Sequence, residues 1–188
     1  FGPILAALGF AIELRPVVLA GAGLTLLGGI GQIAYVVDCY RRRGPFTTEH
    51  DWRAVSIGHL LLGPAWFVAA VAVALVDVAA GRALAGWSLG LLAVPLVAGW
   101  MLQELVGSWT HLVPSVTPGT PERHARQRRM LAVAPRLRVT AWNLAVALAW
   151  TGLALDLAPM SVAGFVLLAA SVVVALTGLA RSLTAGRA

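Results

Sequence analysis

The sequence predicts an all-α integral membrane protein: a helical bundle of about six spans, of which the first is truncated. Of its 188 residues, 59% are hydrophobic and only 12% are charged, and the mean hydropathy is +0.84. A soluble domain of this size needs a largely polar surface, whereas a bilayer solvates apolar side chains directly. The apolar residues also fall into runs of roughly twenty, the length that crosses a hydrocarbon core of ~30 Å.

The predicted spans form one transmembrane domain, residues 1–188. The opening run, Phe1 to Ile12, is too short to cross a bilayer and lacks both an initiator Met and the basic n-region of a signal peptide. We therefore expect a truncated helix, with the N-terminal half of the same polypeptide upstream of it. The full spans are predicted at Val17–Val37, from just after Thr48 to about Ala79, at Trp87–Val113, at Val139–Leu155 and at Val162–Ala180.

Local signals mark two span ends. Thr48 followed three residues later by Asp51 resembles a capping box, which favours a helix start there. Pro114 is expected to close the fourth span, because proline cannot donate the backbone hydrogen bond that continues a helix. Gly81 and Arg82 are expected to form the turn between the third and fourth spans.

A long polar stretch, residues 115–138, separates the fourth and fifth spans and is predicted to be a basic cytoplasmic loop. Within it, Thr120 supplies a helix N-cap, Pro121 an N1 proline and Glu122 an acid in the first turn. We therefore expect a short surface helix over Arg123–Met130.

The basic residues predict the orientation. All fourteen are Arg, which suggests a GC-rich genome, and the sequence pI of about 11.2 is high enough to raise nucleic-acid binding. That function is rejected because the arginines lie in loops between apolar spans, where the positive-inside rule explains them. Two, Arg15 and Arg82, fall in the other set of loops. The twelve that predict a cytoplasmic side, in the inner membrane of a bacterium, are Arg41, Arg42, Arg43, Arg53, Arg123, Arg126, Arg128, Arg129, Arg136, Arg138, Arg181 and Arg187.

Few polar side chains fall inside the predicted spans, and each is a functional candidate because a polar group in hydrocarbon is costly. They are Gln32, His59, Gln103, Glu104, His111 and Asn143. Cys39 is the single cysteine, so neither an internal disulfide nor a cysteine-based metal cluster is expected. No Ser/His/Asp set, metal-binding cluster or phosphate loop appears, so the catalytic residues are unknown and no metal site is predicted.

His59 and His111 are predicted to lie at similar depth on neighbouring antiparallel spans. Two imidazoles facing each other in this way can ligate a b-type haem iron axially. Ser56, Thr110 or Glu104 would then fix their tautomers. The alternative is that each histidine is packed in the bundle and bonded to a carbonyl, a hydroxyl or Glu104.

Glu104 is a candidate proton-relay acid, and it shares a helix face with Trp100, Gly107 and His111. The alternative is a structural carboxyl, protonated or paired with His111, that holds two helices together. For Gln103 and Asn143, interhelical hydrogen bonding is favoured over ligand binding.

Two further patterns concern packing. Residues 29–34 match the dinucleotide fingerprint G-x-G-x-x-A, but they lie within an apolar span and not after a strand, so we treat the match as fortuitous. Gly21, Thr25 and Gly29 instead predict a smooth ridge for close helix packing. Trp52, Trp87 and Trp109 are expected at the membrane interfaces, and His50 and His124 in solvated loops.

The segment from Gly99 to Val116 resembles the membrane part of actinobacterial multicopper-oxidase and nitrite-reductase-like proteins, whose bundle is similar to haem–copper oxidase subunit I. The family helix reads approximately G-x-x-x-Q-x-x-x-G-x-x-S-Y-L-x-P, followed by a Gly/Pro loop and an Arg-rich stretch. The matching residues are Gly99, Gln103, Gly107, Leu112, Pro114, Pro118, Gly119 and, early in the next span, Asn143.

The resemblance implies the C-terminal half of a bundle of about twelve helices in a redox or respiratory protein, with the N-terminal half, a copper redox domain or other membrane subunits as partners. It departs at two places: His111 replaces the family tyrosine, and Glu104 replaces an apolar residue. The outer end of the helix, Trp87 to Pro95, lacks the family's haem-ligating histidines, so oxidase chemistry does not carry over. A non-catalytic scaffold or a proton-coupled transporter-type bundle is the alternative function.

Overall fold

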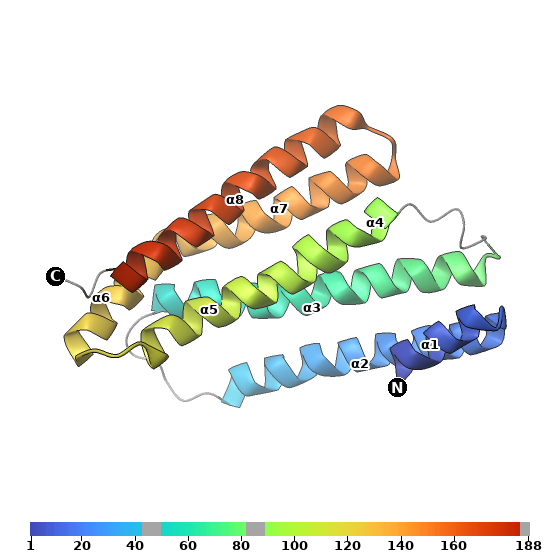
Figure 1. Ribbon diagram of the computed structural model, residues 1–188, viewed down its shortest axis with the longest axis horizontal. Coiled ribbons are helices and arrows are strands. Elements are labelled where there is room, and N and C mark those ends of the chain that lie inside the picture. Colours follow the sequence, from blue (N-terminus) through green and yellow to red (C-terminus); the bar gives the residue numbers. More distant parts are fainter. Residues whose placement is uncertain (43–49, 82–88, 185–188) are drawn as a thin grey trace.

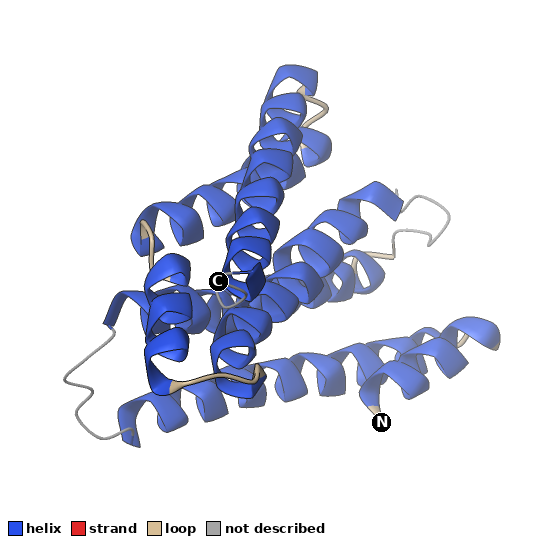
Figure 2. Cartoon of the chain, turned by 60° about the vertical axis from the view of Figure 1, so that its left-hand side comes forward, coloured by secondary structure: helices blue, strands red, loops and turns tan. Residues whose placement is uncertain are grey.

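The computed structural model describes residues 1–42, 50–81 and 89–184, and these residues form helices without any strand (Figure 2). The elements are α1 (Gly2–Ala11), α2 (Arg15–Arg42), α3 (His50–Ala79), α4 (Leu89–Ala93), the π-helical segment η2 (Val94–Met101), α5 (Leu102–Val116), α6 (Pro121–Leu131), α7 (Pro135–Ala154) and α8 (Ala158–Thr184).

Four stretches of the described residues are long and apolar enough to cross a membrane: Arg15–Arg42, His50–Ala79, Leu91–Val116 and Ala158–Thr184. The all-α prediction is therefore confirmed, but the count of about six spans is not. Helix α1 has ten residues, which is too few. Helix α7 has twenty residues, but its first turn carries Arg136 and Arg138, and these lower its hydropathy.

The helices lie in three layers (Figure 1). Helix α3 and the continuous α4–η2–α5 rod form the centre, the α1–α2 hairpin packs on one side through α2, and the α7–α8 hairpin packs on the other. Because α3 contacts α2, η2, α5 and α7, it is the helix around which the bundle is organised.

The described arginines gather at one end of the bundle, except Arg15. Helix α6, the last turns of α2 and α8 and the first turns of α3 and α7 all lie at the end drawn on the left of Figure 1. Arg15 lies at the opposite end, where its guanidinium donates to the carbonyl of Ala79 in the last turn of α3. Arg43, Arg82 and Arg187 lie outside the described residues.

The polar stretch forms the surface helix expected of it. Thr120 is the N-cap of α6 and accepts the Arg123 N–H at 3.4 Å, with Pro121 in the first turn. His124 lies in this helix and not in a loop, and its Nε2 is 2.9 Å from the Thr117 carbonyl oxygen. Thr48, in the capping box predicted for α3, lies outside the described residues, as does Trp87.

The prediction that Pro114 closes the fourth span was wrong, because α5 continues to Val116. A proline in a helix leaves the carbonyl four residues earlier without its usual N–H donor, here that of Thr110. Trp52 Nε1 donates to this oxygen at 2.8 Å, so a side chain of α3 replaces the missing backbone bond. Trp52 is buried there, 4% exposed, in the first turn of α3 at the basic end of the bundle.

The predicted small-residue ridge on α2 is a packing surface used by two partners. A Cβ added at Gly21 would collide with the backbone nitrogen of Ala6 in α1, and one at Gly29 would come within 3.0 Å of Phe67 in α3. The Thr25 hydroxyl donates to the Gly21 carbonyl at 2.8 Å, so it presents no free polar group. The dinucleotide-like residues 29–34 lie inside α2, as expected of a fortuitous match.

Candidate functional site

Three helical elements meet at a buried polar junction, which we define as His59 of α3, Gln103 of α5, Asn143 of α7 and Trp66 of α3. His59 Nδ1 lies 3.1 Å from Gln103 Oε1. Gln103 Nε2 donates to Asn143 Oδ1 at 3.2 Å, and Asn143 Nδ2 donates to Gln103 Oε1 at 3.3 Å. Trp66 Nε1 donates to Asn143 Oδ1 at 2.7 Å. The interhelical role predicted for Gln103 and Asn143 is confirmed.

The π-helical segment η2 supplies one acceptor to this junction and another beside it. Its last bond runs from the Leu102 N–H to the Val97 carbonyl, five residues back, so the turn is wider than an α-turn. The next two carbonyls accept side-chain donors: Ala98 from Trp142 Nε1 at 2.9 Å, and Gly99 from Gln103 Nε2 at 2.7 Å. The irregular backbone thus has its oxygens satisfied from α7 and α5.

Glycines let these helices approach closely. A Cβ at Gly99 would lie 2.7 Å from the Cβ and Cγ of Trp66, and one at Gly107 would lie 3.1 Å from the Cβ of His59. The Ser56 hydroxyl donates to the Gly107 carbonyl at 2.6 Å. Both glycines of the family-like segment are therefore positions where α5 or η2 contacts α3.

His59 is enclosed, with 1% of its surface exposed. The rings of His59 and Trp142 form a T-shaped pair, with 5.4 Å between centroids and 83° between planes. Among the partners considered from the sequence, a carbonyl, a hydroxyl or Glu104, the one found is a carbonyl, the amide oxygen of Gln103. Gln103 and Glu104 are neighbours in sequence but point about 100° apart on the helix, so only one can face His59.

His111 lies in a different environment. Its exposed ring stacks on Trp52 at 5.4 Å and 14°, close to the basic end of the bundle. It lines a hollow of about 260 Å³ together with Cys39, Tyr40 and Arg53. That hollow lies among α2, α3 and α5, whereas the hollow that His59 lines lies between α7 and α8.

The two histidines therefore do not fit one haem iron. Axial imidazole nitrogens lie about 4 Å apart, given iron–nitrogen bonds of ~2 Å. The contacts of Trp52 with Thr110 and of His59 with Gln103 fix the antiparallel register of α3 and α5. His59 is thus level with Gln103, eight residues before His111, a helical rise of about 12 Å. The similar depth inferred from the sequence is corrected by this register.

Glu104 packs against α3 one turn deeper than His59. Its Oε1 is buried and has no hydrogen-bond partner among the described residues, and a Cβ at Gly63 would lie 3.1 Å from it. Trp100, on the same face, packs its ring on that of Phe67, with 4.6 Å between the ring centroids. The predicted shared face of Trp100, Glu104, Gly107 and His111 does contact α3, but Glu104 and His111 meet it at Gly63 and Trp52, eleven residues apart.

Several residues of the site were not selected from the sequence. Trp66 and Trp142 were passed over, although a tryptophan in the middle of an apolar span needs an acceptor for its indole N–H and could have been used as a signal. Arg138 was counted as a loop charge, yet it is half-buried and donates to the Leu131 carbonyl at 2.8 Å.

Two residues that the sequence did select lie outside the site. Trp109 is 48% exposed, and Gln32 is exposed on α2.

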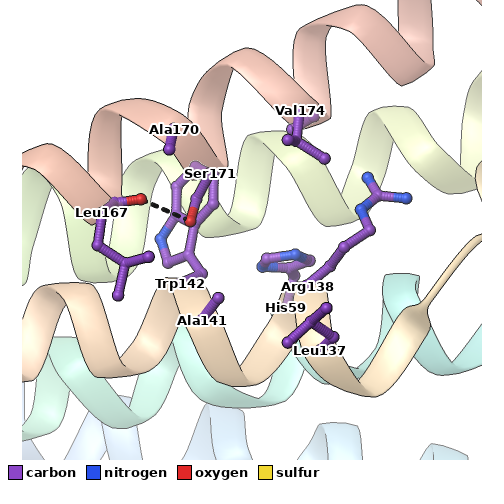
Figure 3. A pocket seen from close by; sticks show the side chains of 10 residues that line it. His59, Leu137, Arg138, Ala141, Trp142, Leu167, Ala170, Ser171 and Val174 are labelled. Atoms are coloured by element: carbon purple, nitrogen blue, oxygen red, sulfur yellow. Dashed lines mark hydrogen bonds between the residues drawn. The ribbon is translucent and has the colours of Figure 1, made fainter.

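A hollow of about 290 Å³ lies between α7 and α8, next to the polar junction. Figure 3 shows His59 and Trp142 on one side, Arg138 extending toward Val174, and α8 closing the opposite side. Ser171 also lines the hollow, and its hydroxyl donates to the Leu167 carbonyl at 2.8 Å. Its walls are otherwise mostly aliphatic side chains of α7 and α8.

Comparison with known protein families, with curated proteins and with solved structures finds no match to this chain. The resemblance at Gly99 to Val116 therefore remains a prediction from the sequence. The chemistry of the junction itself is that of amides, indoles and an imidazole joined by hydrogen bonds. Such groups join helices firmly because an unmade bond in an apolar interior is costly.

Proposed function

We propose that this chain is the membrane scaffold of a larger redox or respiratory protein similar to the haem–copper oxidase type, and that it holds its helices in a fixed arrangement without ligating haem through His59 and His111. The observation that carries the scaffold role is the Gln103 side chain, bonded to His59 on α3 and to Asn143 on α7. The redox context rests on the sequence resemblance alone.

The positions of the resemblance support a scaffold role. Gly99 contacts Trp66, Gly107 contacts His59, and Gln103 and Asn143 bond each other. Pro114 leaves the Thr110 carbonyl to Trp52. The family-like residues thus concentrate in helix contacts and not in a cofactor pocket. An N-terminal half of the same polypeptide and a copper redox domain are the partners we propose.

The finer topology is part of this proposal. Helix α7 is proposed as a further span because it packs along α8, with a Cβ at Gly152 or Gly164 placed against the backbone of the other helix. The arginine-rich end of the bundle is proposed to face the cytoplasm of a bacterium. In a Cys39→Ala background, Arg126→Cys should react with an impermeant maleimide only in opened cells, and Leu157→Cys in intact ones. The reverse pattern refutes the orientation.

Visible absorbance and thermal unfolding of the purified protein test the scaffold function. Gln103→Leu should lower the unfolding temperature, while Gln32→Leu on the exposed face of α2 should not. His59→Ala and His111→Ala should not both remove a low-spin haem band from the spectrum of the reduced protein. A band lost in both variants would refute the proposal and restore the haem pair.

A proton-coupled bundle is the second candidate, favoured by the buried, unbonded Oε1 of Glu104. A carboxyl in this position can hold and release a proton if a path reaches it. Proton uptake into liposomes with an imposed pH gradient should then fall severalfold in Glu104→Gln and be unchanged in Glu122→Gln, on the surface helix. Equal uptake by liposomes with and without the protein would eliminate this candidate.

A further inference from the structure

The hollow beside the polar junction continues toward the basic end of the bundle. A second hollow of about 510 Å³ lies where the α6–α7 connection meets the last turns of α8. Leu137, Arg138 and Val174 line both. The two hollows therefore adjoin along α7 and α8, and together we call them the α7–α8 groove.

The α7–α8 groove has the length of a lipid chain. Its lining on α8 runs from Leu167 to Arg181, fourteen residues apart, which is about 21 Å of helix. Half of a hydrocarbon core is about 15 Å. The packing of Gly152 on Ser161 and of Gly164 on Ala149 puts Trp142 level with Ser171, which is ten residues or about 15 Å of helix before Arg181. An acyl chain that begins near Arg181 can thus follow the groove to Trp142 within one leaflet.

The two ends of the groove differ in charge. Trp142 and His59 line the inner end, and both are already bonded within the protein. Arg138 and Arg181 both line the hollow at the outer end. Arg138 uses one of its N–H donors on the Leu131 carbonyl, and a guanidinium has five. Two cations over an apolar channel complement a molecule with an anionic head and an apolar tail.

Gly178 keeps the outer end open. A Cβ at this position would meet no atom closer than Leu131 Cδ2, at 4.0 Å. It differs in this from Gly164 on the same helix, which packs against the backbone of Ala149. Helix packing therefore does not require a glycine at 178, and a side chain there would project into the groove.

We propose that the α7–α8 groove binds one anionic phospholipid, with its phosphate between Arg138 and Arg181 and an acyl chain extending to Trp142. The occupant is the lipid and not free phosphate, because the apolar lining extends far beyond the two arginines. A zwitterionic lipid fits the channel equally well but brings its own cation to the basic end. The preference is therefore electrostatic, about fivefold in affinity for each arginine, the equivalent of about 1 kcal/mol.

Native mass spectrometry of the whole chain in detergent measures this preference directly. Dioleoyl-phosphatidylglycerol is titrated against dioleoyl-phosphatidylcholine, which has the same chains, and inorganic phosphate is titrated in a third arm. The first bound phosphatidylglycerol should be held more than tenfold more tightly than phosphatidylcholine, and phosphate should not displace it.

Three variants locate the site. Arg138→Gln and Arg181→Gln should each lower the affinity for phosphatidylglycerol about fivefold, and Gly178→Leu should weaken both lipids by obstructing the groove. Arg126→Gln removes the same charge from α6, outside the groove, and should bind as the unaltered protein does. Unfolding temperatures measured in phosphatidylcholine show whether each variant is folded.

Three results would overturn the proposal: equal affinity for the two lipids, displacement by phosphate, or unchanged binding when both groove arginines are replaced. Should Arg138→Gln fail to fold because its bond to Leu131 is lost, Arg181→Gln and Gly178→Leu still decide the matter. Neither of those residues makes an interhelical hydrogen bond in the described chain that its replacement would break.

Discussion

The polar junction and the α1–α2 hairpin are both contacts between apolar helices, but they are built from opposite kinds of residue. At the junction, large side chains bond one another, and His59 and Gln103 are each at most 1% exposed. In the hairpin, Gly2, Gly9 and Gly21 bring backbone against backbone. Lipid is as apolar as leucine, so neither contact is driven by burial from water.

The difference teaches how each contact fails. A glycine contact has no side chain that can move aside, so an added methyl group must separate the helices. A hydrogen-bonded contact tolerates small changes of shape but not the loss of a partner, because the groups left behind remain buried. Substitutions that distinguish steric from polar failure therefore test the comparison.

The largest effect is expected from Gly21→Leu. The added side chain collides with the backbone of Ala6, which cannot rotate away, so α1 should detach from α2 at a cost of about 3 kcal/mol, the upper end of overpacking costs. Proximity of the two helices is measured by cysteine cross-linking between them, in a Cys39→Ala background. Gly23→Leu is the matched control, since no atom lies within 4 Å of its Cβ position. Equal cross-linking in both would mean the hairpin does not depend on close approach.

The next effect is expected from Gln103→Leu. It removes the bonds to His59 and Asn143 and should lower the free energy of unfolding by about 1–2 kcal/mol. Asn143→Leu should cost less in this background than alone, because one of its partners is already gone, although its bonds to Trp66 and Val139 remain. Denaturation of the four proteins in the double-mutant cycle measures the coupling. Additive losses would show that the two amides act independently.

How far the sequence predicts this fold depends on whether a feature is local. Apolar length located the long helices, and Thr120 with Pro121 located α6, since both signals act within a few residues. The end of α5 was missed because the donor that replaces the Pro114 bond, Trp52, lies 58 residues from Thr110 in the chain.

The site depends on the relative position of helices, which spacing along one helix does not contain. The depth of His59 and that of His111 were each inferred from the ends of their own spans. The contacts between α3 and α5 show that the two residues differ in depth by more than two helical turns. The polar character of Gln103 and Asn143 was readable because both are costly inside hydrocarbon. That they bond each other became visible only when α7 was placed beside η2 and α5.

A smaller effect is expected from Trp52→Phe, which keeps the ring but removes the donor to the Thr110 carbonyl. The loss should be about 1 kcal/mol in the free energy of unfolding. Pro114→Ala restores a backbone N–H that can reach the same carbonyl. Trp52→Phe should therefore cost less when combined with Pro114→Ala, as measured by thermal unfolding. An unchanged cost would show that the indole stabilises through its ring, which His111, Arg53 and Arg128 contact, and not through its N–H.

The smallest effect is expected where side-chain hydrogen bonds are exposed to water, at the start of α6. The Thr120 hydroxyl bonds the carboxylate of Glu122 and, with the backbone N–H of Glu122, holds the pKa of this carboxyl below its usual value. A lowered pKa in the folded state favours folding at pH values above the usual carboxyl pKa, and the contribution is lost as the pH falls through the folded value. Thr120→Ala should raise the Glu122 pKa toward its usual value, and Thr120→Ser should restore the depression. The carboxyl shift in an NMR titration measures this. Thr117→Ala is the control, since Thr117 bonds Val113 and Gln127 and leaves Glu122 untouched. Because Glu122 is fully exposed, the free energy of global unfolding should scarcely change in Thr120→Ala, unlike in Gln103→Leu.

A Glu122 pKa that does not move in Thr120→Ala would assign the lowered pKa to the positive end of the α6 dipole instead.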